Sequence, residues 1–179
     1  CKPLHVDLAV LIDWSSLRLG DFHRVTDALL SLVSHLDIGP EKSRVSVVSF
    51  GHRIYMDESF NLTAYASNVD LTAAIRRLQW DTVREADTAM AIRFLQDYQL
   101  PVQLARPNIK RIGLVITDGN SKKFDQTQLA VRTALDSGID LMSVAVGNSA
   151  NYVEIFTIAG WERQRVFRLD NVPWFFYKL

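Results

Sequence analysis

Apolar runs of strand length alternate along the chain with stretches in which apolar residues recur every three or four positions. The runs lie at 6–12, 45–50, 112–117, 139–146 and 166–169. Nearly continuous apolar runs are typical of strands covered on both faces of a sheet. The helical stretches lie at 22–36, 71–78, 89–98, 125–137 and 152–159, and Pro173 suits the first turn of a final helix.

This alternation predicts an α/β fold: a doubly wound, mostly parallel sheet with helices on both faces. A short run at 54–56 is expected to form one antiparallel edge strand beside 45–50. No internal repeat or low-complexity linker interrupts the pattern. We therefore expect residues 1–179 to form a single domain, excised from a larger multidomain protein.

Composition narrows the class of protein. Of 179 residues, 48 % are hydrophobic and 22 % are charged, which is enough for one large core. Twenty Lys and Arg balance twenty Asp and Glu, whereas electrostatic binding to nucleic acid or anionic membranes needs a basic surplus. The longest apolar runs are too short to span a bilayer. We expect no nucleic-acid partner and no membrane insertion.

Two short sequence features concern processing outside the cell. Cys1 is the only cysteine, so an internal disulfide is impossible and a bridge, if the protein is secreted, needs a partner outside this chain. The alternative is a stray surface thiol. Asn61-Leu62-Thr63 is an N-glycosylation sequon. It predicts a glycan on Asn61, although such triplets also arise by chance.

Polar residues follow two of the predicted strands. Asp13 ends the first and is followed by Ser15 and Ser16, and Asp118 ends the third and is followed by Asn120 and Ser121. The carboxyl ends of parallel strands form the ligand-binding edge of such sheets. Carboxylates with hydroxyls suit a hard cation such as Mg²⁺. The alternative is that both aspartates cap loops and helix ends.

Catalytic signatures are missing from the sequence. It has no Gly-x-Ser-x-Gly elbow, no phosphate-binding Gly-x-x-x-x-Gly-Lys-[Ser/Thr] loop and no Gly-x-Gly-x-x-Gly turn. The four histidines are scattered without metal-ligand spacing. We expect no enzymatic activity.

Segments 10–17, 45–51, 88–95 and 114–121 together resemble the von Willebrand factor type A domain, in particular the A domains of extracellular matrix proteins. The resemblance implies a metal-ion-dependent adhesion site, in which Mg²⁺ or Mn²⁺ keeps one coordination position open for a partner's carboxylate. Asp13, Ser15 and Asp118 match its ligand positions. Leu17 stands where the second serine should be, and Ala86 where the threonine should be.

The two departures lower the expected metal affinity, because Mg²⁺ needs six oxygen ligands and two of the five positions lack an oxygen. We expect no required cofactor, at most weak Mg²⁺ or Mn²⁺ binding, and no metal-driven movement of the final helix. The alternative is a site rebuilt by Ser16, Thr82 or Asp87.

The resemblance implies a secreted, non-catalytic adhesion module of the extracellular matrix, with collagen as the usual class of partner. The predicted contacts come from the strand-edge loops and are Trp14, Ser16, Asp87, Asn120 and Ser121. Packing inside the loop is the alternative role for Trp14, since strand-end aromatics are more often buried, and Trp80, Trp161 and Trp174 are also expected to be buried or partly buried. The alternative function is a structural or self-associating domain of a fibrous or mineralised matrix.

Overall fold

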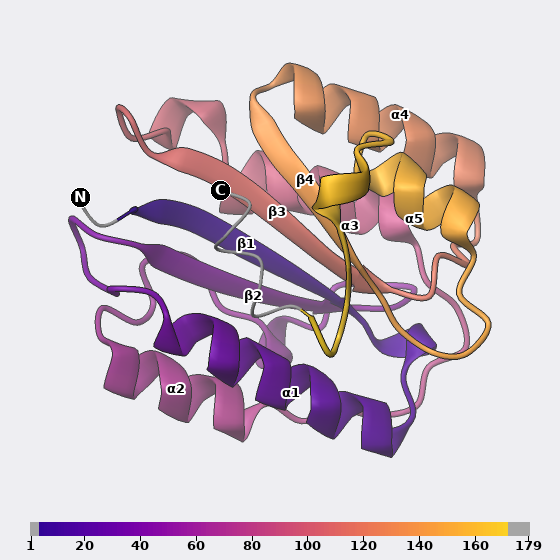
Figure 1. Ribbon diagram of the computed structural model, residues 1–179, viewed down its shortest axis with the longest axis horizontal. Helices are drawn as coiled ribbons and strands as arrows, with labels where there is room; N and C mark the ends of the chain where they lie inside the picture. Colours follow the sequence, from indigo (N-terminus) through magenta and orange to yellow (C-terminus); the bar gives the residue numbers. More distant parts are fainter. Residues whose placement is uncertain (1–3, 172–179) are drawn as a thin grey trace.

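The structure is a computed structural model that describes residues 4–171. One sheet forms its middle layer, and helices cover both faces (Figure 1). The strands are β1 (Val6–Asp13), β2 (Arg44–Phe50), β3 (Lys110–Thr117), β4 (Ile139–Ala145) and β5 (Val166–Arg168). All pair in parallel in the order β2-β1-β3-β4-β5. The expected doubly wound α/β fold is confirmed.

The strand order places a topological switch point at the carboxyl ends of β1 and β3. From β1 the chain crosses to β2 on one side, and it later returns to β3 on the other side. Connections from the two strands therefore leave in opposite directions and open a crevice between them, where ligands bind in folds of this kind.

Two groups of helices cover the sheet. On one face lie α1 (Leu19–Ser34) and α2 (Asn68–Arg77). On the other lie α3 (Thr88–Phe94), α4 (Phe124–Asp136) and α5 (Tyr152–Ile158), and α3 continues into a π-helical turn at Leu95–Gln99. No helix within residues 4–171 has the length and apolar character needed to cross a membrane.

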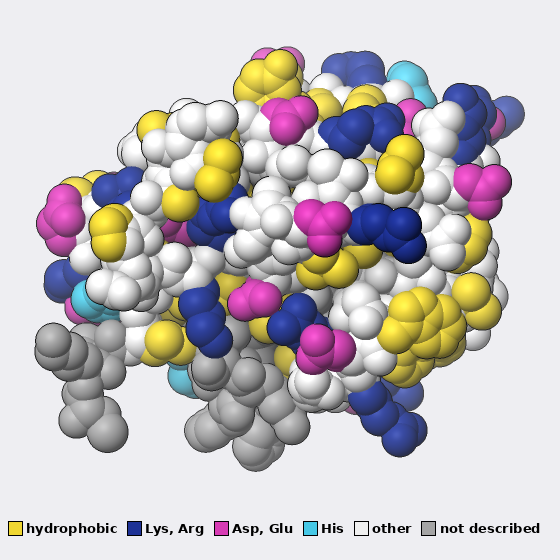
Figure 2. Space-filling model, turned by 90° about the horizontal axis from the view of Figure 1, so that it is seen from above, with side chains coloured by type: hydrophobic (Ala, Val, Ile, Leu, Met, Phe, Trp, Pro, Cys, Tyr) yellow, Lys and Arg dark blue, Asp and Glu magenta, His cyan; other side chains and the backbone are white. Residues whose placement is uncertain are grey.

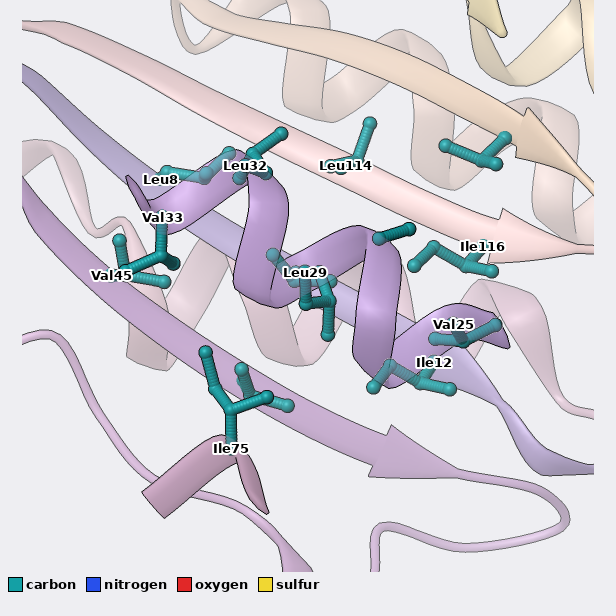
Figure 3. Packing of buried hydrophobic residues seen from close by; sticks show 14 of the residues in the cluster. Leu8, Ile12, Val25, Leu29, Leu32, Val33, Val45, Ile75, Leu114 and Ile116 are labelled. Carbon is teal, nitrogen blue, oxygen red and sulfur yellow. The ribbon is translucent and has the colours of Figure 1, made fainter. Parts of the chain in front are cut away.

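The core has one part on each face of the sheet because side chains alternate along each strand. In β1, Leu8 and Ile12 face the α1 side, where they pack with residues such as Leu29 (Figure 3). Ala9 and Leu11 belong to the cluster on the α3 side. Burial on both faces explains the nearly continuous apolar runs of the sequence.

The expected antiparallel edge strand is not formed. Only isolated antiparallel bridges join Phe50 to Ile54 and Val47 to Phe60. Between them the chain turns through a 3-10 helix at Met56–Glu58, so the segment leaves the edge of β2 before a ladder can continue.

The predicted burial of Trp80 and Trp161 has a different outcome for each residue. Trp80 is partly buried as expected, but Trp161 is 62 % exposed and the expectation for it was wrong. Trp161 has φ 62° directly after Gly160 with φ 63°, so this left-handed turn carries its side chain outward. Cys1, the final helix from Pro173 and Trp174 lie outside the described residues.

On the face in Figure 2, cationic and anionic side chains are interspersed.

Candidate functional site

The carboxylate of Asp13 is the centre of the switch-point crevice. Asp13 ends β1 and is fully buried. Its Oδ1 accepts hydrogen bonds from the Ser15 backbone nitrogen at 2.9 Å and the Ser15 hydroxyl at 2.7 Å. Its Oδ2 accepts from the hydroxyls of Ser16 at 2.6 Å and Thr117 at 2.8 Å. Since a carboxylate offers about four lone-pair positions, these four donors saturate it.

The buried position changes the acidity of Asp13. Desolvation raises the pKa of its carboxyl, the hydroxyl hydrogen bonds from Ser16, Ser15 and Thr117 lower it in part, and the charge of Asp118 raises it further. Burial has the largest effect, so the pKa of Asp13 is raised overall.

Ser16 joins the two loops of the crevice. Its hydroxyl donates to Asp13 and accepts a hydrogen bond from the Asp118 backbone nitrogen at 2.9 Å. Asp118 itself is half-buried, and its Oδ1 accepts from the Asn120 backbone nitrogen at 3.0 Å. The loops after β1 and β3 are thus held together by the protein's own hydrogen bonds, and within the second loop the Gly119 backbone nitrogen donates to the Thr117 hydroxyl.

Both departures from the adhesion-site pattern are packed into the core. Leu17 is 6 % exposed and belongs to the cluster on the α1 side of the sheet. Ala86 is 1 % exposed and packs with the cluster on the α3 side. The Ala86 carbonyl accepts a hydrogen bond from the Lys122 backbone nitrogen at 2.9 Å. Neither position offers a side-chain oxygen to a cation.

The residues considered as replacement ligands have other partners or lie elsewhere. Asp87 caps α3, its Oδ1 accepting from the Met90 backbone nitrogen at 2.9 Å, and Ser16 is used as described above. Thr82 is exposed and lines the wider cleft. Across the described residues, no three His, Cys, Asp or Glu side chains are arranged to hold a metal ion. With a saturated Asp13 carboxylate, this donor set fits a divalent cation poorly.

Glu154 is a buried carboxylate beside the crevice that the sequence analysis did not identify. It lies in α5 and is 1 % exposed. Its Oε2 accepts from the Ser121 hydroxyl at 2.8 Å, while its Oε1 has no partner among the described residues. Burial raises the pKa of Glu154, and the charges of Asp13 and Asp118 add to that rise. The sequence offered one sign of this site, because Glu154 is a single acidic residue within an apolar helical stripe.

Trp14 is buried below the loop surface. It is 5 % exposed, and its ring stacks on Tyr55 with centroids 4.4 Å apart. The Trp80 indole nitrogen donates to the Trp14 carbonyl at 3.2 Å, and the Arg53 guanidinium lies 4.5 Å from the Tyr55 ring centroid. These contacts favour the packing role of Trp14 over direct contact with a partner.

The crevice opens into a cleft of about 990 Å³. Ser15, Asp118 and Thr82 line it near the switch point, and Arg168 and Tyr152 line it farther away. Of the other predicted contacts, Asn120 is exposed, while Asp87 and Ser121 are half-buried. The cleft is lined mainly by polar and charged side chains.

Comparisons with known proteins find a matching family model and similar proteins. A family model described as "von Willebrand factor type A domain" matches residues 7–174. Matrilin-4 of Homo sapiens is 32 % identical over 154 residues, which are 83 % of this chain and 24 % of that protein. The collagen alpha-6(VI) chain of Homo sapiens is 29 % identical over 172 residues, which are 96 % of this chain and 7 % of that protein. The chain therefore spans a quarter or less of these relatives.

Solved structures share the fold at low sequence identity. Proximal thread matrix protein 1 from the mussel byssus has a TM-score of 0.82 at 17 % identity, covering 95 % of this chain and 46 % of that chain. Another structure of that protein is described with a zinc-occupied MIDAS motif, at a TM-score of 0.81, 18 % identity and coverage of 96 % and 45 %. Manganese-loaded TRAP protein of Plasmodium vivax has a TM-score of 0.79 at 16 % identity, covering 92 % and 68 %.

Proposed function

This chain belongs to the von Willebrand factor type A domain family, of the extracellular matrix type, and we propose that it binds a partner protein without a metal ion. Its curated relatives support an extracellular matrix-binding module as the general role. Metal independence and the identity of the partner go beyond those relatives. The module is proposed to act by binding alone, without catalysis.

The observation that carries the metal independence is the state of Asp13. Four donors occupy its carboxylate, and the neighbouring ligand positions are the buried, apolar Leu17 and Ala86. Mg²⁺ sheds its water reluctantly and needs near-ideal octahedral oxygen geometry. Coordination by Asp13 would have to displace at least one of its own hydroxyl or amide donors. The hydrogen bonds instead hold the loops in place for binding.

The proposed binding surface is the set of exposed and half-buried loop positions around the cleft. Ser15 and Ser16 line the cleft, and the exposed Asn120 and the half-buried Asp87 and Ser121 belong to the neighbouring loops. Trp14 is left out of the contact set because it is buried. Collagen is the first partner class to test, on the strength of the family resemblance.

The experiment is surface-based binding of the domain to immobilised collagens and other matrix proteins, in Mg²⁺ and in EDTA. We expect equal affinity in the two buffers. Asn120→Ala should weaken binding, while the control Gln128→Ala, on the exposed part of α4, should not. Loss of binding in EDTA would overturn metal independence. The absence of binding to any matrix component would overturn the proposed class of function.

Self-association is the second candidate function, because α5 and the turn after it carry an exposed aromatic strip. Tyr152, Val153 and Trp161 are 47 %, 56 % and 62 % exposed. The Phe156 ring lies between the two aromatic rings, 6.5 Å from Tyr152 and 5.9 Å from Trp161 by centroid. Sedimentation velocity at rising concentration tests this role: association that Trp161→Ser removes would support it, and a strict monomer would exclude it.

A further inference from the structure

A second, smaller pocket lies at the opposite edge of the sheet from the crevice. It has a volume of about 160 Å³. Asp7, Arg44 and Arg111, which lie at the beginnings of β1, β2 and β3, line its inner side. The three sequon residues Asn61, Leu62 and Thr63 form part of its wall. The only Asn-x-Ser/Thr sequence of the chain is therefore built into the rim of a pocket.

The conformation of the sequon leaves its amide nitrogen available. Asn61 is exposed, and its Oδ1 accepts hydrogen bonds from the backbone nitrogen and the hydroxyl of Thr63, both at 3.0 Å. Within residues 4–171, the Asn61 Nδ2 donates no hydrogen bond that a substituent would break. The folded turn can thus carry a group on Nδ2 without losing a contact.

Other parts of the pocket wall are uncovered apolar surface. Tyr98 is 70 % exposed and Leu104 is 73 % exposed, and both line the pocket. The wall therefore suits a ligand with an apolar ring face.

We propose that Asn61 carries an N-linked glycan and that its first N-acetylglucosamine occupies this pocket. The CH face of the sugar ring lies against Tyr98 and Leu104. Aromatic side chains provide a rigid apolar surface for such packing. No linker is needed, because Asn61 itself lines the pocket.

The modification is a substitution at carbon with a defined leaving group. The donor is a lipid-diphosphate-linked oligosaccharide of the secretory pathway. The Asn61 Nδ2 forms a bond to the anomeric carbon of the first sugar, and the bond from that carbon to the diphosphate oxygen breaks. The lipid diphosphate leaves with the electron pair, and the nitrogen releases one proton. Because the pocket lies at the amino ends of the strands, the glycan leaves the crevice loops free for a partner.

Occupancy is tested on the chain secreted from cultured human cells. Peptide mass spectrometry after enzymatic deglycosylation in heavy-oxygen water should find Asn61 converted to labelled aspartate. Thr63→Ala should abolish the label, while Thr63→Ser should retain it. Secreted wild-type protein with unmodified Asn61 would overturn the proposal, whatever the outcome of the matrix-binding experiment.

The packing of the sugar is tested by thermal unfolding. Protein trimmed to a single N-acetylglucosamine is compared with Asn61→Gln, and we expect a Tm about 2–4 °C higher for the glycoprotein. In a Tyr98→Ala background this difference should fall below about 1 °C, whereas a Tyr152→Ala background should preserve it. Equal differences in all three backgrounds would show that the sugar does not pack on Tyr98.

Discussion

Rebuilding the missing ligand positions should convert the crevice into a metal site. The perturbation is Leu17→Ser combined with Ala86→Thr, which restores an oxygen at both positions while keeping Asp13, Ser15 and Asp118. The matched control is Leu17→Ala with Ala86→Val, which makes similar changes of volume without supplying oxygen. If Leu17 and Ala86 are what weakens metal binding, only the first variant will respond to a divalent ion.

The magnitude follows from the burial of the two residues. Leu17 is 6 % exposed, and removing a buried leucine side chain costs about 2–5 kcal/mol. Ala86 is 1 % exposed, and enlarging a packed residue costs about 1–3 kcal/mol. The metal-free variant should therefore lose about 3–8 kcal/mol of unfolding free energy. A metal at one hundred times its Kd returns about 2.7 kcal/mol, or about 5–11 °C in Tm for a domain of this size.

The assay is thermal unfolding of the three proteins in EDTA, Mg²⁺ and Mn²⁺. We expect wild type and the apolar control to change by less than about 1 °C between buffers, and the rebuilt variant to gain about 5–11 °C. A comparable gain for the wild type would refute the reasoning, because it would mean that the existing donors suffice. A folded rebuilt variant that ignores both ions would also refute it, because the donors already bound to Asp13 would then prevent metal binding by themselves.

Three further predictions concern buried groups outside the ligand positions. Burial raises the pKa of Glu154 above its ordinary 4.5, so ionisation of this carboxyl destabilises the fold as pH rises. Glu154→Gln should therefore be more stable than wild type near pH 7 and equally stable at acidic pH, and a pH-independent gain in denaturant melts would contradict this. Arg106 forms a two-point ion pair with the 3 % exposed Asp7. Arg106→Met should lower the free energy of unfolding by about 3–5 kcal/mol, and adding Asp7→Asn should recover part of that loss. An unchanged urea midpoint for Arg106→Met would refute this prediction. Trp14→Ala should lower the free energy of unfolding in urea by about 3–5 kcal/mol, because it removes a buried ring. The affinity for the partner should stay unchanged. A large loss of affinity in the folded variant would instead show that Trp14 contacts the partner.

The sequence by itself determined the layered fold, because strands buried on both faces of a parallel sheet have nearly continuous apolar sequences. Those runs predicted all five strands, and the helical periodicity predicted the helices between them. Asp13 and Asp118 were recognisable for a related reason, since a polar residue directly after a buried strand marks the binding edge. Leu17 and Ala86 were noticed only because the family resemblance implies ligand positions there.

Tertiary structure decided what depends on neighbours far apart in the chain. The Thr117 hydroxyl completes the saturation of Asp13 across 104 positions, and Trp14 is buried because Tyr55 and Trp80 come to lie against it. Residues 54–56 do not form a strand, because the chain turns away from β2 before continuous hydrogen-bonded pairing with it can form. Local pattern records which side of an element is buried, whereas hydrogen-bond partners and loop burial depend on how separate elements are brought together.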